Sequence, residues 1–484
     1  MNFVTTEKYR EKARAALQDE VLQRALKDVQ SRLGPATAAL YAEHAEGPDR
    51  VRCRAHEIRE RALEDLDLLL ESLAGKIRQR GGEVHFARDA RDAVETCLRI
   101  ARRHDVKLIV KGKSMVTEEI GLNQALIEAG IETVETDLGE YIIQLAGEAP
   151  SHIIAPAIHK TREQIGRLFS EKLGMPYTDD PPRLTHEARR ALRKKFLAAD
   201  MGLSGCNLAC AETGHITTLS NEGNVRMSTT LPKVHVAFMG MERIVGQLTD
   251  HEILLRLLSH GAAAQKLGGY VSYIGGPALP DQCDGPREFH LIILDNGRSR
   301  ILADKEFREI LCCLRCGACL NVCPVYGKIG GHSYGFAYTG PIGAALTPLI
   351  VGINRAADLC LGETLCGACQ KACPVNINIP RLLLALRSKL AEGDPLWDVH
   401  PGRRGEKCFF TLWSWIIRRR ILYDFILKLS MVFEKFLPGQ GGWIHRLPYP
   451  FGGWTASRDI RPVTSKSFRS RWKKMRKEKV GKAP

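Results

Sequence analysis

The first 80 residues are patterned as helices. Apolar residues recur at helical spacing over residues 7–33 and 49–80, among Ala, Leu, Glu, Arg and Gln. Two Gly–Pro pairs, Gly34–Pro35 and Gly47–Pro48, interrupt this pattern, and such pairs are typical of helix ends and turns. The pattern therefore predicts an N-terminal helical region that is broken at both pairs.

From Gly82 the period of the pattern changes. Short apolar runs at residues 84–87, 107–111, 133–136 and 152–156 alternate with amphipathic stretches such as residues 89–103. Alternation of short apolar runs with helical segments is typical of an α/β domain with a largely parallel sheet. We expect the four runs to be strands of that sheet.

Further strand-like runs follow in the same part of the chain. They cover residues 215–220, 233–240 and 268–274. The segment from His290 to Leu302 is predicted to be a β-hairpin, because the pair Asn296–Gly297 suits the left-handed backbone of a two-residue hairpin turn.

The net positive charge of the chain comes from its C-terminal part. Residues 401–484 contain 20 Lys and Arg and 5 Asp and Glu. The difference, +15, equals the net charge of all 484 residues. The rest of the chain is therefore balanced, and arguments about charged partners apply to the C-terminal part. We predict four regions: a helical region (1–65), an α/β domain (66–304), a cysteine-rich module (305–392) and a basic C-terminal region (393–484).

An apolar and aromatic stretch lies inside the basic region, at residues 409–433. Arg418–Arg420 divide it, so it lacks the roughly 18 uninterrupted apolar residues that a spanning helix needs. Two interpretations stay open: a helix lying in the membrane interface, and a helix packed on its own domain or on a partner subunit. We expect no nucleic-acid binding, because no recognition motif accompanies the basic charge.

Cysteines are numerous and clustered. Of 15 cysteines, nine lie between Cys312 and Cys373. Residues 1–10 contain no apolar segment of the kind that a secretory signal requires, so we expect a cytoplasmic protein, with peripheral association at the inner face of the membrane as an option. In a reducing compartment, clustered cysteines indicate metal ligands rather than disulfides.

The first cysteine motif has the spacing of a bacterial ferredoxin. It runs C-x2-C-x2-C-x3-C-P and ends at Pro324. Two-residue gaps let one tight loop direct three thiolates at one cluster, whereas the longer gap before proline sends the fourth thiolate to the other cluster. The four cysteines are Cys313, Cys316, Cys319 and Cys323.

The second motif repeats the last three cysteines of the first, with Cys366, Cys369 and Cys373 before Pro374. Exchange of the fourth ligands predicts two 4Fe–4S clusters. The ligands of cluster 1 are then Cys313, Cys316, Cys319 and Cys373, and those of cluster 2 are Cys323, Cys366 and Cys369.

The fourth ligand of cluster 2 stays open. Its expected position, three residues before Cys366, is Glu363. Cys360 is a possible substitute; a carboxylate or water at that iron and a 3Fe–4S cluster are the alternatives. Cys312 is expected to be a neighbour rather than a ligand, since its use breaks the spacing.

Zinc is the alternative metal, because paired C-x2-C motifs also build zinc ribbons. A zinc ribbon needs neither a third cysteine at the same spacing nor a fourth before proline. The spacing therefore favours iron–sulfur clusters.

Two polar segments of the α/β domain are candidates for a binding site. Residues 111–115 lie between a strand-like and a helix-like run, a placement that suits anion binding. Residues 205–214 and 220–226 combine glycines with charged side chains, which could line a polar pocket. Tight turns between core strands also explain that pattern, and spacing alone favours the turns. The candidate pocket residues are Lys111, Glu212 and Arg226.

The combination of segments resembles the lactate utilization protein B family. The resemblance covers about residues 5–475 and rests on the two cysteine motifs and on segments 111–121, 205–226, 332–335 and 340–343. It implies an α/β lactate-utilisation (LUD) domain, similar in fold to sugar isomerases and CoA transferases. It further implies an α-helical ferredoxin-like dicluster module, flanked by a helical N-terminal and a basic C-terminal region. Family members usually lack the first cysteine of the second motif, as this chain does.

The resemblance also implies a function. It is that of the electron-carrying subunit in the oxidation of L-lactate to pyruvate, with electrons passing through two 4Fe–4S clusters. The implied partners are a cysteine-rich subunit similar to heterodisulfide reductases and a second LUD protein, with a membrane or quinone-side acceptor. Two alternatives remain: the LUD domain is itself a catalytic or substrate-binding 2-hydroxy-acid domain fed by the clusters, or it is a scaffold for partner subunits.

Overall fold

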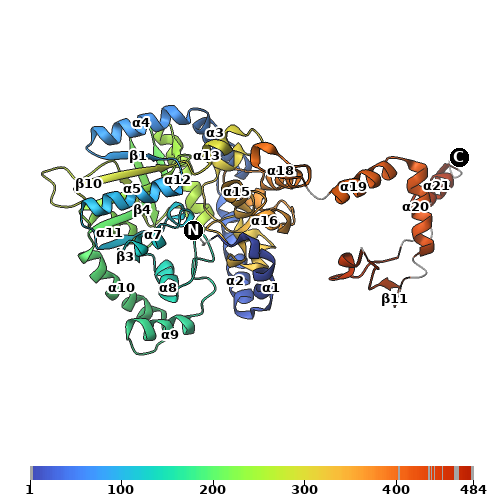
Figure 1. The fold of residues 1–484 in the computed structure, drawn as a ribbon, viewed down its shortest axis with the longest axis horizontal. Helices are drawn as coiled ribbons and strands as arrows, with labels where there is room; N and C mark the ends of the chain where they lie inside the picture. Colours follow the sequence, from blue (N-terminus) through green and yellow to red (C-terminus); the bar gives the residue numbers. More distant parts are fainter. Residues whose placement is uncertain are drawn as a thin grey trace. The chain divides into compact units, whose positions relative to one another are not determined.

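A computed structural model describes residues 4–401, 404–433, 437, 439–440, 442–449, 451–462 and 468–480. The chain forms two compact units, Met1–His400 and Pro401–Pro484. The first unit holds an α/β domain and, beside it, a smaller helical part that contains both cysteine motifs (Figure 1).

A six-stranded parallel sheet is the centre of the α/β domain, in the order β1-β10-β7-β4-β2-β3. In β10, Leu291 and Ile293 belong to one hydrophobic core and Ile292 and Leu294 to another. Side chains of a strand alternate between the two faces, so both faces of the sheet are covered, as parallel sheets require. The strands are β1 (Glu83–Ala87), β2 (Leu108–Lys111), β3 (Glu132–Glu135), β4 (Met201–Gly205), β7 (Val234–Gly240) and β10 (Glu288–Leu294).

Helices flank this sheet on both sides (Figure 1). Helix α5 (Ala90–Arg103) begins after Asp89, whose carboxylate accepts a hydrogen bond from the amide of Asp92, and its apolar side packs on β1 and β10. The other helices of the domain are α4 (Leu66–Gln79), α6 (Met115–Glu119), α7 (Leu122–Glu128), α8 (Leu138–Ala146), α9 (Arg162–Leu173), α10 (Pro181–Ala198), α11 (Asn224–Thr230), α12 (Leu248–Ala263) and α13 (Arg298–Ala303).

A second, four-stranded sheet has the order β8-β5-β6-β9. Its strand β6 pairs antiparallel with both β5 and β9. The predicted strands at residues 215–220 and 268–274 are confirmed as β6 and β9. The strands are β5 (Leu208–Cys210), β6 (His215–Ser220), β8 (Ile244–Val245) and β9 (Tyr270–Ile274).

The predicted strand at residues 152–156 is wrong, because this segment forms turns. His152 is buried there, and its Nδ1 accepts hydrogen bonds from the amides of Ile154 and Ala155. Its Nε2 lies 3.4 Å from Oδ1 of Asn321 in the cysteine module. The apolar run thus packs a loop against that module instead of joining a sheet.

The predicted hairpin at residues 290–302 is also wrong. Strand β10 ends at Leu294 and helix α13 follows. Asn296 and Gly297 have φ of 45° and 90°, so the left-handed turn exists but leads from a strand into a helix. Arg298 is buried at the start of that helix and forms ion pairs with Glu119 and Glu242, which hold the helix in place.

Three helices precede the α/β domain: α1 (Tyr9–Gln18), α2 (Glu20–Ala42) and α3 (Pro48–Glu64). The predicted break at Gly47–Pro48 is confirmed, but Gly34–Pro35 lies inside α2. The helix continues through this pair because it packs closely on the cysteine module. A Cβ on Gly34 would lie only 3.2 Å from the carbonyl oxygen of Asn321. The close approach lets α2 pack against the cysteine module, which compensates for the hydrogen bond that proline cannot donate.

The cysteine module consists of short helices joined by the cysteine loops. Helices α1 and α2 pack on it through α14. Its elements are η2 (Arg308–Cys312), η3 (Leu320–Val322), α14 (Tyr326–Ile329), η4 (His332–Tyr334), α15 (Gly340–Val351), α16 (Ala357–Gly362), α17 (Ala368–Ala372), α18 (Ile379–Glu392) and η5 (Pro395–Trp397).

The C-terminal unit contains α19 (Arg404–Ile417), α20 (Arg420–Phe433), α21 (Phe468–Val480) and the short strands β11 (Gly439–Gln440) and β12 (Trp443–Ile444). The arginine run thus falls at the junction of α19 and α20. Within the described residues, no helix has the length and apolar character needed to cross a membrane.

Candidate iron–sulfur centre

The two cysteine loops have the same backbone conformation. In the first loop, Arg315 and Gly317 flank Cys316 and have φ of 59° and 78°. In the second loop, Leu365 and Gly367 flank Cys366 and have φ of 57° and 82°. Left-handed geometry is costly for Arg and Leu, so its repetition shows that both loops are shaped to turn their ligand side chains to one side.

The folded chain brings the motif cysteines into two neighbouring sets. Cys313 and Cys316 lie near Cys373, which the second motif contributes, and their proximity adds to burial in raising the pKa of the Cys373 thiol. Cys369 lies near Cys366 and Glu363, and burial together with these neighbours raises the pKa of Cys369 to about 11. Cys313, Cys316 and Cys373 are three of the four cysteines that the spacing assigns to cluster 1.

Burial favours the protonated form of three thiols of the first motif. Burial, with Cys313 as a smaller cause, raises the pKa of Cys316 to about 12. Burial likewise raises the pKa of Cys319 and Cys323. A metal that binds these cysteines as thiolates therefore displaces protons, and its binding free energy must cover their deprotonation.

Backbone amides point at three of the sulfurs. The amide of Arg315 donates to Sγ of Cys313 at 3.3 Å. The amides of Tyr326 and Ile377 donate at 3.4 Å to Cys323 and Cys373. Hydrogen bonds to ligand sulfurs stabilise negative charge on a cluster and tune its reduction potential.

Buried arginines surround the first loop. Arg243 donates to the carbonyl oxygens of Cys313 and Leu314 at 2.7 and 2.8 Å. Arg52 donates to the carbonyl oxygen of Cys373 at 2.7 Å. Arg315 is buried, stacks 4.9 Å above the ring of Tyr338 and pairs with Glu242. Two other cations next to the motifs, Lys328 and Lys371, are exposed.

Cys360 and Glu363 are the residues considered for the position where the second motif lacks a cysteine. Cys360 is buried on α16, and its thiol donates to the carbonyl oxygen of Ala356 at 3.8 Å. Glu363 is buried after the end of α16, and its Oε2 accepts from the thiol of Cys323 at 3.4 Å. Cys312 is buried near Arg59.

The three predicted pocket residues of the LUD domain do not converge. Lys111 is buried at the end of β2 and forms ion pairs with Glu118 and Glu135. Glu212 is exposed and caps α12 by accepting from the amide of Leu248 at 2.7 Å. Arg226 is exposed on α11.

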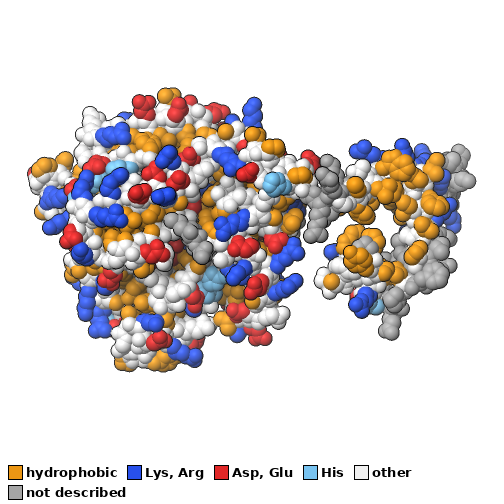
Figure 2. All heavy atoms as spheres, in the orientation of Figure 1, with side chains coloured by type: hydrophobic (Ala, Val, Ile, Leu, Met, Phe, Trp, Pro, Cys, Tyr) orange, Lys and Arg blue, Asp and Glu red, His pale blue; other side chains and the backbone are white. Residues whose placement is uncertain are grey.

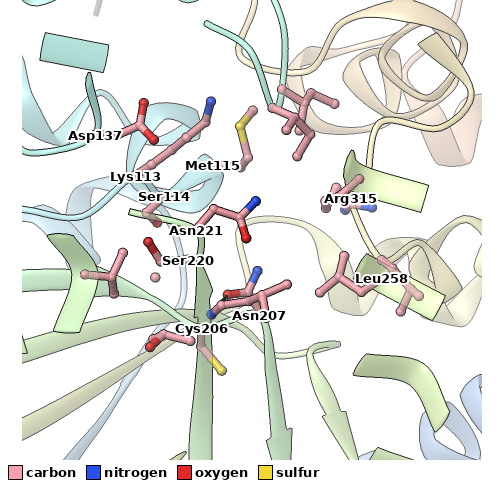
Figure 3. Close-up of a pocket in the computed structure, with 18 of the residues that line it drawn as sticks. Lys113, Ser114, Met115, Asp137, Cys206, Asn207, Ser220, Asn221, Leu258 and Arg315 are labelled. Carbon is pink, nitrogen blue, oxygen red and sulfur yellow. Dashed lines mark hydrogen bonds between the residues drawn. The ribbon is translucent and has the colours of Figure 1, made fainter. Parts of the chain in front are cut away.

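A cavity of about 280 Å³ instead lies between the LUD domain and the first cysteine loop. In Figure 3, Lys113, Ser114 and Asn207 of the LUD domain face it from one side and Arg315 from the other. Nη1 of Arg315 has no hydrogen-bond partner among the described residues. The segments singled out in the sequence, 111–115, 205–214 and 220–226, each contribute residues to this cavity, but the three pocket residues chosen from them do not line it, and the part of Arg315 was missed.

The donors suit iron–sulfur clusters. Seven cysteine thiols form two sets inside one module, and six of the seven are buried. Thiolates are the ligands of iron–sulfur clusters, and burial and backbone amides of this kind are the means by which a protein tunes a cluster. The seven cysteines would hold two clusters, which supply one-electron redox chemistry when bound.

Comparison with known proteins matches both parts of the chain. A LUD domain model matches residues 70–294, and a 4Fe–4S dicluster domain model matches residues 309–377. The second match favours iron–sulfur clusters over zinc. A DUF162 family protein of Deinococcus radiodurans is a structural match with a TM-score of 0.27 and 14% identity, covering 47% of this chain and 98% of that chain.

Curated relatives match nearly the whole chain. Lactate utilization protein B of Bacillus licheniformis is 42% identical over 477 residues, 98% of either protein. That of Bacillus subtilis is 46% identical over 391 residues, 80% of this chain and 81% of the relative. The "uncharacterized electron transport protein YkgF" of Escherichia coli is 41% identical, over 96% of either protein. The chain, with its LUD domain and 4Fe–4S dicluster domain, belongs to the lactate utilization protein B family.

Proposed function

We propose that this protein is the iron–sulfur electron-transfer subunit of a system that oxidises L-lactate to pyruvate, carrying electrons through two 4Fe–4S clusters. The observation that carries the proposal is the arrangement of the cysteines: two loops of the same conformation, with Cys373 of the second motif beside Cys313 and Cys316 of the first. The names of the relatives, which refer to lactate utilization and electron transport, support it.

The arrangement suits a carrier because exchanged ligands hold two clusters in one small module. An electron that enters one cluster then has the other as its neighbour. Buried Arg52, Arg243 and Arg315 offset the negative charge of reduced clusters.

The proposal includes partners. A cysteine-rich subunit similar to heterodisulfide reductases and a second LUD protein would exchange electrons with this one, and the final acceptor would be a quinone. A carrier of this kind needs its partners for turnover. The purified chain, given L-lactate and an artificial acceptor, should therefore show no lactate-dependent reduction until both partners are added.

Cluster content tests the proposal directly. Anaerobically purified protein should contain about eight iron and eight sulfide per chain, or about seven iron if one position is incomplete. Cys369→Ser should lower the iron content and the electron paramagnetic resonance (EPR) signal of the reduced protein. Cys283→Ser, which changes an exposed cysteine outside the motifs, is the matched control and should change neither. Zinc without sulfide would overturn the proposal.

A second candidate function is the binding of a 2-hydroxy acid by the LUD domain. The specific observation is the cavity lined by Lys113 and Arg315, because a lysine and an arginine together suit a carboxylate. This arrangement would bring the substrate next to the first cysteine loop.

Calorimetry with L-lactate distinguishes the two candidates. If the cavity binds lactate, Arg315→Lys should raise the dissociation constant about tenfold or more, because lysine cannot form the same planar contacts. Arg226→Gln, on an exposed arginine that does not line the cavity, should leave it unchanged. Absence of lactate binding to the unaltered protein would leave the carrier as the sole candidate.

We also propose that α19 and α20 associate with a membrane surface. Phe410, Trp413 and Trp415 of α19 and Ile421 and Phe425 of α20 are between 48% and 85% exposed. Figure 2 shows hydrophobic side chains and Lys or Arg side chains together on this unit. Exposed aromatic residues beside arginines suit an interfacial position, where quinones are accessible.

Flotation with anionic lipid vesicles tests the membrane proposal. Deletion of residues 409–437, or the double substitution Trp413→Asp and Trp415→Asp, should abolish flotation and slow quinone reduction. Leu267→Asp changes a side chain that is 68% exposed in the other unit and should have no effect. Unchanged flotation after the deletion would contradict the proposal and favour packing on a partner subunit.

A further inference from the structure

The second motif has a glutamate, Glu363, at the position where the first motif has its first cysteine ligand. Glu363 and Cys313 stand at equivalent positions, three residues before Cys366 and Cys316. Both have extended backbones, with φ and ψ of −88° and 147° for Glu363 and −60° and 127° for Cys313. The left-handed residue two positions later is also shared. The backbone therefore presents the Glu363 side chain as it presents that of Cys313.

The Glu363 side chain points to the expected cluster. Its Oε2 lies 3.4 Å from Sγ of Cys323, the cysteine that the first motif contributes to cluster 2. It also lies close enough to Cys369 to affect that thiol electrostatically. Glu363 thus shares one site with two of the three cysteines assigned to cluster 2.

The carboxylate is buried without an ion-pair partner. Glu363 is 8% exposed, and its oxygens form hydrogen bonds with Tyr334 and Cys323 but no ion pair among the described residues. Arg387 donates instead to the backbone carbonyl oxygen of Glu363 at 2.7 Å. A buried carboxylate is costly unless a positive charge compensates it, and a bound iron would supply that charge.

A tyrosine leaves one carboxylate oxygen for the metal. The hydroxyl of Tyr334 donates to Oε1 of Glu363 at 2.8 Å. Tyr334 is itself fully buried, with the ring of Tyr9 packed edge-on against it at 5.9 Å between centroids. Hydrogen bonds of this kind orient a metal ligand, so Oε2 faces Cys323 in a fixed direction.

Cys360 is held elsewhere. Its thiol turns back to the carbonyl oxygen of Ala356 on the same helix, and its own carbonyl oxygen accepts from Nε of Arg387 at 2.8 Å. Ligation by Cys360 would require the last turn of α16 to unwind and these contacts to break.

We propose that Glu363 is the fourth protein ligand of cluster 2, so that this cluster is held by Cys323, Cys366, Cys369 and the Glu363 carboxylate. The inference rests on the proposed iron–sulfur function and specifies its second cluster. One iron of cluster 2 then carries an oxygen ligand, which is harder than thiolate and holds a soft cluster iron less firmly.

Variants of the full-length protein, purified anaerobically, test the inference by iron analysis, Mössbauer spectroscopy and EPR. The unaltered protein should contain about eight iron, with one iron in a distinct, oxygen-ligated environment. Ferricyanide should take one electron from cluster 2 and release that iron as Fe²⁺, leaving an oxidised three-iron EPR signal. Glu363→Ala should contain about seven iron and show this signal as purified.

Two further variants complete the test. Glu363→Cys should retain about eight iron, lose the distinct Mössbauer component and resist ferricyanide, since cysteine supplies the missing thiolate. It also keeps the test usable if Glu363→Ala does not fold. Cys360→Ala is the matched control and should behave as the unaltered protein. Loss of one iron in Cys360→Ala but not in Glu363→Ala would overturn the inference while leaving the electron-carrier function intact. Zinc without sulfide in the unaltered protein would overturn both.

Discussion

Glu242 links the LUD domain to the first cysteine loop. Its buried carboxylate lies 2.7 Å from Arg298 of α13 and 3.4 Å from Arg315 of the loop. Burial would raise the pKa of Glu242, but Arg298, Arg315 and Arg243 lower it to about 2. The ionised carboxylate therefore compensates arginines from both parts of the unit, and neither part supplies the whole network.

Replacement of this carboxylate should be strongly destabilising. We expect Glu242→Gln to lower the free energy of unfolding by about 3–5 kcal/mol, because it removes the carboxylate paired with buried Arg315 and leaves Arg298 with Glu119 alone. Denaturant titration of the metal-free protein measures the change. Glu46→Gln removes half of an exposed pair with Arg54, and should cost at most about 1 kcal/mol.

The same carboxylate predicts a dependence on pH. The folded pKa of Glu242 is about 2, below its ordinary value of 4.5, so its stabilisation is complete above pH 4.5 and is lost as the pH falls toward 2. Thermal unfolding between pH 5 and 3 should therefore show a steeper loss of stability in the unaltered protein than in Glu242→Gln. Equal slopes would contradict the assigned pKa.

The short 3-10 helix η4 packs tightly on the loop that sequence analysis took for a strand. A Cβ on Gly331 would lie 1.7 Å from the carbonyl oxygen of Ser151, and that oxygen also accepts from the hydroxyl of Tyr326. Such a contact between backbones tolerates only glycine, although the φ of Gly331, −77°, is open to any residue.

A pair of glycine substitutions tests this contact. Gly331→Ala should lower the free energy of unfolding by about 1–3 kcal/mol or more, because backbone atoms must move apart. Gly75→Ala, in the exposed interior of α4 with no atom within 4 Å of the new Cβ, should raise it by up to about 1 kcal/mol. Thermal denaturation measures both. A neutral Gly331→Ala would show that the loop moves freely.

Both proposed cluster sites lie entirely within the first of the two compact units. All eight proposed ligands and the buried arginines around them precede His400. The amphipathic helices with the exposed aromatic side chains lie in the second unit. Electron carriage and membrane association should therefore be separable.

A chain that ends at His400 tests this separation. It should retain the iron content and visible absorption of the full chain, because no proposed ligand is removed, and it should lose flotation with anionic vesicles. Iron content and flotation are measured on the same preparation. Loss of iron from the shortened chain would mean that the second unit contributes to the stability of the module.

Local patterns in the sequence identified the features that depend on neighbours in the chain. The cysteine spacing determines which sulfurs one tight loop can direct at one cluster, and the alternation of apolar runs and amphipathic stretches determines a parallel sheet with covered faces. Asn296–Gly297 correctly indicated a left-handed turn. The turn leads into a helix because Arg298 meets Glu119 and Glu242, which are distant in the chain.

Features made by residues far apart in the chain needed the folded structure. The continuity of α2 through Pro35 depends on packing against the cysteine module, and the cavity at Arg315 exists only where that module meets the LUD domain. The cysteine motifs predict seven cluster ligands from spacing alone. Glu363 is distinguished from Cys360 by contacts with Cys323 and Tyr334, 40 and 29 residues away, because burial and hydrogen bonding are set by the side chains that folding brings together.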